Sequence, residues 1–348
     1  MINQDHLFMQ RCFSLALLGE GSVSPNPMVG AVLVHDGRVI GEGWHRKYGE
    51  AHAEVRCLES VSAENQHLIP HSTLYCSLEP CFHFGKTPPC VDLVLKHRIP
   101  RVVVSNTDPN PLVAGQSLEK LRSAGVEVVE GILEAEGRRL NRAFFTWIVE
   151  KRPFIVLKWA QSVDGFIGKE GERTAISGPA ALRLVHKWRS EADAILVGTK
   201  TAVTDNPRLD ARFYTGKNPL RIALDRQGKI PATHHLLDDS IDTWVFGAAR
   251  QGSFERTVFI PTDGLVDIQD ILNTLKTAKR AILLVEGGAQ VLQQFLDGGW
   301  WDEIRRLESS GRLKDGIAAP RLPVVAEMTE SFQLAGDTVR IFERVRSF

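Results

Sequence analysis

Three metal-ligating residues, His52, Cys81 and Cys90, set the strongest constraint on how this chain can fold. One imidazole and two thiolates suit Zn²⁺, and three protein ligands leave the fourth tetrahedral position open for water, as in a catalytic site. Glu54 follows His52 by two residues, a spacing that keeps its carboxylate off the metal and lets it carry protons. The fold must therefore bring residue 52 close to the ends of the segment 81–90.

Apolar periodicity predicts that helices and strands alternate along the chain, which is typical of α/β layer structures. The pattern predicts helices at 4–18, 53–60, 116–124, 180–191 and 289–296, and strands at 28–34, 38–44, 72–77, 101–105, 126–129, 154–158, 194–197, 220–224, 244–246, 281–285 and 339–345. His52 and Glu54 then lie at a helix start, Cys81 follows a strand, and Cys90 opens a helix. The alternating tail 339–345 is expected to close the edge of a sheet.

The chain of 348 residues is long enough for two domains. An amphipathic, charged segment, 138–152, ends at Pro153, and we place the boundary there, with domains 1–147 and 148–348. Lys and Arg number 42, as do Asp and Glu, so the chain lacks the basic excess of proteins that wrap nucleic acid. This balance favours a small-molecule substrate.

The amino-terminal residues do not form a signal peptide, and no apolar run is long enough to span a bilayer. The five cysteines are odd in number, so a disulfide framework is not expected and a reduced, cytoplasmic location fits better. Cys57 and Cys76 lie inside apolar patterns and are expected to be buried core residues. His83 could complete a structural zinc site, but Glu54 favours a catalytic one.

Three segments carry a specific resemblance: 24–30 (SPNPMVG), 52–54 (HAE) and 80–90 (PCFHFGKTPPC). Together with 108–115 (DPNPLVAG), they resemble the bifunctional deaminase/reductase family of riboflavin biosynthesis, including its long spacing between the two cysteines. The resemblance implies a cytidine-deaminase-like, three-layer α/β/α amino-terminal domain. It also implies that zinc-activated water replaces the 2-amino group of a phosphoribosylated pyrimidine, with Glu54 moving the protons.

The same resemblance implies further contacts to this substrate. Asn26 would meet the edge of the base, His83 and Lys86 would meet the phosphoribosyl group, and Asp108 and Asn110 would also contact substrate. From the residues alone, turn chemistry beside proline is an alternative explanation for Asn26, Asp108 and Asn110.

In the second half, 157–158, 162–165, 197–199 and 205–209 resemble the reductase half of the same family, which is similar to dihydrofolate reductase in fold. The chain has no G-x-G-x-x-G fingerprint, but Gly287 and Gly288 stand where a strand passes into a helix and could admit a phosphate. A tight turn is the alternative for a lone glycine pair. The resemblance implies NADPH as cofactor and hydride transfer to C1′ of the ribosylamino group, after deamination.

The resemblance also implies roles for single residues of this half. Either Asp205 or Lys158 would donate the proton. Substrate contacts would come from Arg189, Leu209, Arg212 and Glu286, and cofactor contacts from Ala160, Thr201, Asp205, Gly288, Ala289, Gln290, Val291 and Leu292. Taken singly, Lys158 could be a solvent-exposed lysine at a strand end and Arg189 a surface charge on a helix. The segments 173–175 and 307–319 receive no role.

Two other classes of protein stay open at this point. The chain could deaminate cytosine or adenine, free or in a polynucleotide, and carry an unrelated second domain. Alternatively, zinc could be structural and the protein a binding module, but such a site needs no general base at Glu54. The resemblance also implies self-association through the domain 148–348.

Overall fold

The computed structural model describes residues 3–82, 89–111, 113–250, 252–262, 264 and 266–345. Contacts divide the chain into two compact units, 1–151 and 152–348, and each is described by itself. Among the described residues, every helix is too short or too polar to cross a membrane.

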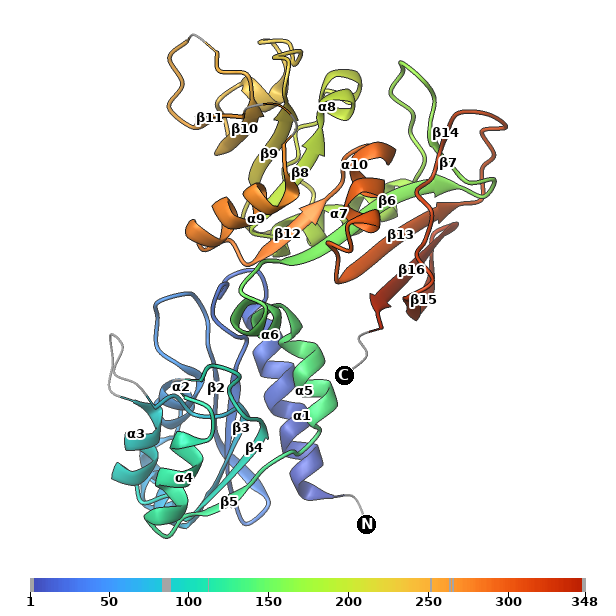
Figure 1. Ribbon diagram of the computed structural model, residues 1–348. Coiled ribbons are helices and arrows are strands. Elements are labelled where there is room, and N and C mark those ends of the chain that lie inside the picture. Colours follow the sequence, from blue (N-terminus) through green and yellow to red (C-terminus); the bar gives the residue numbers. More distant parts are fainter. Residues whose placement is uncertain are drawn as a thin grey trace. The chain divides into compact units, whose positions relative to one another are not determined.

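The first unit is a sheet between two layers of helices (Figure 1). Its described strands are β1 (Gly30–His35), β2 (Arg38–Trp44), β3 (Thr73–Leu78), β4 (Arg101–Asn106) and β5 (Glu127–Val129), in the order β2-β1-β3-β4-β5. The β1–β2 hairpin is antiparallel, β1 runs antiparallel to β3, and β3, β4 and β5 are parallel. Because β3 and β4 are parallel neighbours, the segments that follow them emerge at the same edge of the sheet.

Alternating side chains of these strands supply the two cores of the unit. Leu33 packs with α2 (Ala53–Glu59), α3 (Cys90–Lys96) and α4 (Gln116–Ser123) on one face. Val32 faces α1 (Gln4–Ala16) on the other, where α5 (Glu134–Leu140) and α6 (Arg142–Val149) also lie (Figure 1). Cys57 and Cys76 are fully buried in the first of these cores, as predicted.

The second unit is built on a larger sheet, with the described order β11-β10-β9-β8-β12-β6-β13-β16-β15. The strands are β6 (Phe154–Ser162), β8 (Ala194–Gly198), β9 (Leu220–Asp225), β10 (Thr243–Gly247), β11 (Thr257–Pro261), β12 (Ile282–Val285), β13 (Glu303–Ser309), β15 (Ala326–Leu334) and β16 (Asp337–Arg344), with a separate pair β7 (Phe166–Gly168) and β14 (Ile317–Ala318). From β11 to β13 neighbouring strands are parallel, and β16 and β15 add an antiparallel edge.

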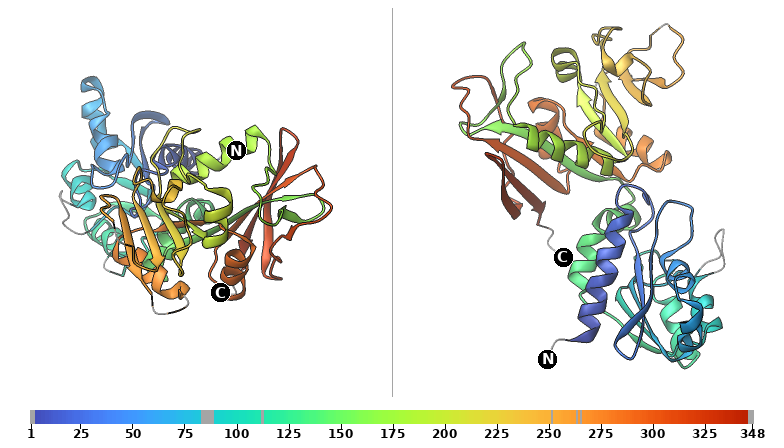
Figure 2. Two further views of the ribbon diagram at one scale, coloured as in Figure 1. Left: turned by 90° about the horizontal axis from the view of Figure 1, so that it is seen from above. Right: turned by 180° about the vertical axis from the view of Figure 1, so that it is seen from behind.

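Helices cover both faces of this sheet (Figures 1 and 2). Helices α9 (Ile268–Thr277) and α10 (Ala289–Asp297) pack their apolar sides on one face. Helix α7 (Pro179–Glu191) packs Val185 and Trp188 against Leu307 and Val339 on the opposite face, and the short α8 (Thr199–Asp205) follows β8. Both units therefore have the predicted α/β architecture.

One expectation about the tail is wrong. The tail strand β16 does not close the sheet, because it lies between β13 and β15, and β15 forms the edge. Most residues of β15 are exposed, so its sequence lacks the alternating apolar pattern that predicts a half-buried strand.

Candidate active sites

The predicted metal ligands converge on one edge of the first sheet, although they come from three different elements. His52 is the residue before α2, Cys81 follows β3 after Glu79 and Pro80, and Cys90 is the first residue of α3. The N–H of Cys90 donates to Cys81 Sγ at 3.2 Å, and the N–H of Val91 donates to the Cys81 carbonyl at 3.3 Å. These backbone contacts fix the two cysteines relative to each other.

The donor atoms fit a zinc ion. All three lie within 4.8 Å of one another. His52 Nδ1 lies 3.5 Å from Cys81 Sγ and 3.4 Å from Cys90 Sγ. A tetrahedral zinc with ordinary Zn–N and Zn–S bond lengths separates such a nitrogen and sulfur by about 3.5 Å. The nitrogen–sulfur distances therefore match those of a preorganised zinc site.

The acid–base properties of these residues suit a metal site with a proton carrier. The Cys90 side chain and the His52 ring lower the pKa of Cys81 to about 4 against the opposing effect of burial, which favours the thiolate that binds metal. Glu54, in the first turn of α2, is only 3% exposed. Burial raises the pKa of its carboxyl, and the nearby Cys81 charge raises it further, as expected of a carboxylate that exchanges protons near neutral pH.

Asn26 reaches this site through a residue that the sequence reasoning missed, the buried His45. Asn26 Nδ2 lies 3.3 Å from His45 Nε2, and His45 Nδ1 lies 3.2 Å from the Ala51 carbonyl. The His45 ring meets the His52 ring edge to face, with 5.5 Å between centroids. The His45 tautomer with its proton on Nδ1 would donate to the Ala51 carbonyl and accept from the Asn26 amide. Through this hydrogen bond and its ring contact with His52, His45 connects Asn26 to a metal ligand. Nothing in its spacing from His52 signals this.

Two of the other predicted contacts of this unit lie on the loop after β4. Asp108 and Asn110 follow β4, where Asp108 Oδ1 accepts the Asn110 N–H at 2.8 Å. This contact is the turn chemistry considered as the alternative explanation. His83 and Lys86 lie outside the described residues.

The second unit contains a cavity of about 1270 Å³ at the carboxyl ends of β6, β8, β9 and β12. Most residues predicted for the reductase half line it: Lys158, Ala160, Arg189, Thr201, Asp205, Glu286, Gly288, Ala289, Gln290, Val291 and Leu292. Two do not. Leu209 is buried in the protein, and Arg212 is partly exposed and pairs with Asp210.

In the lining of the cavity, three charged residues meet. Arg189 on α7 binds Glu286 through Nε and Nη2, at 2.9 and 2.8 Å, and Lys158 Nζ lies 3.6 Å from Glu286 Oε2. Their side chains are 11%, 7% and 13% exposed, respectively. Lys158 and Arg189 are therefore not solvated surface charges.

Gly287 and Gly288 form the turn between β12 and α10. A Cβ on Gly287 would lie 2.4 Å from the Val197 Cα, and Gly288 has a φ of 37°. Both glycines are needed for packing and backbone conformation, and they place the start of α10 at the cavity wall. Asp205 ends α8 at the same cavity, and burial raises the pKa of its carboxyl, although Arg173 opposes this effect.

Other residues that line the cavity received no role from the sequence. They include the segment 173–178, of which 173–175 was expressly left without a role, and the two cations Arg226 and Lys229 just after β9. Only position in the sequence could have indicated a role for the two cations. Arg226 directly follows the carboxyl end of a predicted strand, and ligands bind at the carboxyl ends of strands in open α/β sheets.

Comparison with known families gives one match in each unit. Residues 2–106 match the "cytidine and deoxycytidylate deaminase zinc-binding region", and residues 153–307 match the "RibD C-terminal domain". The chain is 40% identical over 307 residues to riboflavin biosynthesis protein RibD of Aquifex aeolicus, covering 86% of this chain and 85% of that protein. It is 35% identical over 321 residues to RibD of Escherichia coli K12, covering 86% of each.

Solved structures agree with these matches. A diaminohydroxyphosphoribosylaminopyrimidine deaminase/5-amino-6-(5-phosphoribosylamino)uracil reductase from Thermotoga maritima is similar, with a TM-score of 0.90 and 34% identity over 98% of this chain and 99% of that one. RibD of Acinetobacter baumannii has a TM-score of 0.86 and 31% identity, covering 99% of each chain. This protein therefore belongs to the RibD family of bifunctional enzymes of riboflavin biosynthesis, which join a zinc-binding deaminase domain to a reductase domain.

Proposed function

We propose that the first unit deaminates 2,5-diamino-6-(5-phosphoribosylamino)pyrimidin-4(3H)-one. The observation that carries this assignment is the convergence of His52, Cys81 and Cys90 beside the buried Glu54. Those three residues would hold the metal, and zinc, when bound, supplies a water of lowered pKa. Glu54 would take up and return the protons that the loss of ammonia requires.

The remaining contacts of this unit would orient the substrate. Asn26, held by His45, would present its amide to the edge of the pyrimidine. Asp108 and Asn110 would contact the substrate from the loop after β4, and His83 and Lys86 would complete the site.

We infer that the second unit then reduces the ribosyl group to ribityl, with NADPH as hydride donor. The cavity is lined by Arg189, Lys158 and Glu286 and by the turn before α10. Arg189 and Arg212 would bind the phosphate of the substrate, since guanidinium groups match phosphate geometry. Leu209 and Glu286 would contact other parts of the substrate. The residues Ala160, Thr201, Asp205 and 288–292 would contact the cofactor.

The assignment is tested by giving the protein the diamino substrate, with and without NADPH, and weighing the products. Without NADPH, we expect the mass change for replacement of an amine by oxygen; with NADPH, two further hydrogens. Glu54→Gln should abolish ammonia release, keep zinc bound, and leave reduction of the deaminated compound unchanged. Glu59→Gln is the matched control, because Glu59 lies on the same helix but in solvent, paired with Arg56.

Full deaminase activity in Glu54→Gln would refute the proton role. For the second unit, we expect oxidation of NADPH to require the deaminated compound, and Arg212→Ala to weaken binding of that compound. Equal rates with NADH and NADPH would count against the cofactor assignment.

A further inference from the structure

A buried carboxylate, Glu79, stands between the metal site and the loop of Asp108 and Asn110. It directly follows β3 and precedes Pro80 and Cys81. Leu78 on β3 is paired with Asn106 on β4, and the Glu79 N–H donates to the Asn106 carbonyl at 2.9 Å. The side chain is therefore held where these two parallel strands end, and the residue is only 4% exposed.

Four donors converge on this carboxylate. Oε2 accepts the N–H of Asp108 at 3.1 Å and of Gly115 at 3.0 Å. Oε1 accepts the N–H of Ser117 at 3.2 Å and also the Ser117 hydroxyl. In the part of the chain that the structure describes, the groups that contact the Glu79 side chain through hydrogen bonds are neutral N–H or O–H donors, so both oxygens accept.

One consequence concerns the loop 108–115. Its first and last residues donate to the same oxygen, so Glu79 closes the loop at both ends. Within it, the Asn110 carbonyl accepts the N–H groups of Val113 and Ala114, each at 2.8 Å. The described residues of this loop, all but Leu112, thus form a compact turn around Asn110, and both ends of the turn are held by one carboxylate two residues before a metal ligand.

We propose that Glu79 is a positioning residue of the deaminase: it fixes the loop of Asp108 and Asn110 relative to Cys81 and so sets substrate affinity. This inference rests on the proposed deamination and on the proposed substrate contacts of Asp108 and Asn110. Glu79 itself touches no reacting atom. It acts through the loop that it closes.

Glu79→Met is the sharpest test, because the side chain keeps almost the same length but has no oxygen. The buried N–H groups of Asp108, Gly115 and Ser117 then all lose their acceptor. We expect KM for the diamino substrate to rise at least about tenfold, kcat to change less than about threefold, and zinc to stay at one per chain. Amide exchange at Asp108, Gly115 and Ser117 should become at least about tenfold faster.

Glu119→Met is the matched control, because Glu119 is an exposed residue of α4; its kinetics and amide exchange should stay at wild-type values. An unchanged KM in Glu79→Met would overturn the proposal, whether kcat is kept or lost, since a merely destabilised protein loses active molecules without changing KM. Loss of zinc with unchanged amide exchange would also overturn it, by making Glu79 a support for the metal alone. A wild-type protein that releases no ammonia would instead refute the proposed function, and amide exchange would still report whether Glu79 fixes the loop.

Discussion

Glu286 in the reductase cavity is paired with two cations, because its carboxylate contacts both Arg189 and Lys158. Burial alone would raise its pKa, but the two cations outweigh this effect and lower the pKa from 4.5 to about 2. A carboxyl group whose pKa is lower in the folded state than in the unfolded state stabilises the fold. This contribution is complete at a pH above the pKa of the unfolded state, and it is lost as the pH falls through the pKa of the folded state. We therefore expect Glu286→Gln to lower the free energy of unfolding by about 3 kcal/mol at neutral pH.

The same argument predicts the pH dependence. The difference between wild type and Glu286→Gln should shrink as pH falls from 4.5 towards 2, the interval between the two pKa values. Urea denaturation near pH 7 and at about pH 3 measures this difference. Glu172→Gln, at an exposed residue of the same cavity wall, should change stability by less than about 0.5 kcal/mol. A difference that stays constant over this interval would show that the ion pairs are not its source.

Asp205 and Lys158 remain the two candidates for the proton donor in reduction, and both line the cavity. Burial raises the pKa of Asp205 and lowers the pKa of Lys158, so each group moves closer to the range of a general acid. Lys158, however, is already paired with Glu286. We expect Asp205→Asn to lower kcat for reduction by about 10² or more, and Lys158→Met to affect mainly KM. Steady-state kinetics with the deaminated compound distinguishes the two, and the opposite pattern would make Lys158 the donor.

Among single residues, the sequence predicts the roles of those that lie close together in one motif. His52 and Glu54 are two residues apart at a helix start, and the spacing of Cys81 and Cys90 already suggests a shared metal. The burial of Lys158 and Arg189 could not be predicted in this way, because it depends on Glu286, which lies 97 positions after Arg189. His45 was missed for a similar reason: its partner Asn26 is 19 positions away, on a different segment.

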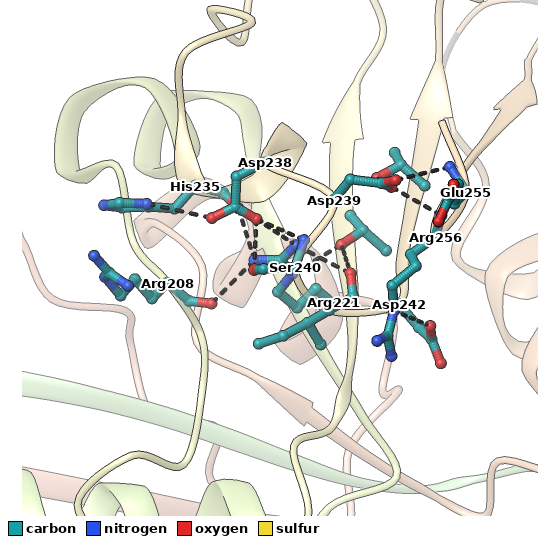
Figure 3. A network of polar contacts seen from close by, with 12 residues as sticks. Arg208, Arg221, His235, Asp238, Asp239, Ser240, Asp242, Glu255 and Arg256 are labelled. Carbon is teal, nitrogen blue, oxygen red and sulfur yellow. Dashed lines mark hydrogen bonds and ion pairs between the residues drawn. The ribbon is translucent and has the colours of Figure 1, made fainter. Parts of the chain in front are cut away.

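Among the elements, β9 is anchored by Arg221, a side chain that is 1% exposed (Figure 3). Its guanidinium donates to Thr243 Oγ1 at 2.8 Å and to the His235 carbonyl at 2.7 Å, and it lies 3.4 Å from Asp238. A longer contact, 3.5 Å, reaches the Arg208 carbonyl in the segment after Asp205. One arginine thus joins β9 and β10 to two loops of the reductase unit.

We expect Arg221→Met to lower the free energy of unfolding by about 3 kcal/mol, because several buried acceptors lose their donor at once. Arg256→Met is the control in the same region (Figure 3), since Arg256 and its partner Asp242 are half-exposed and such surface pairs contribute about 0–1 kcal/mol. Denaturation of both variants measures the contrast. Equal losses would mean that the buried network does not stabilise the unit more than a surface pair does.

Burial helps prediction but does not guarantee it: the partly buried α9 and β13 were missed from the sequence, and so was the exposed β15. The predicted strand 194–197 lies within β8, which is buried throughout its length. The edge strand β15 has mostly exposed side chains, so nothing in its pattern requires a strand; it forms because β16 offers a partner. The misplacement of the tail strand follows directly from missing β15.

At the scale of the whole molecule, each unit has its own sheet, its own core and its own candidate site. The metal ligands all belong to the first unit, and the residues that line the reductase cavity all belong to the second. The predicted boundary at 147/148 lies in α6, which ends at Val149, while β6 begins the second unit's sheet at Phe154. The two reactions should therefore be separable by treatments that act on one site only.

Zinc removal makes this separation measurable. Because structural and catalytic zinc contribute to the stability of the fold that binds them, chelation should abolish ammonia release and destabilise the first unit. Reduction of separately supplied deaminated compound should stay within about twofold of its original rate, since the second unit keeps its own core. Zinc analysis, ammonia release and NADPH oxidation on the same sample provide the measurement, and adding zinc back should restore deamination alone. A parallel fall in reduction, recovered with zinc, would show that the two units depend on each other for activity.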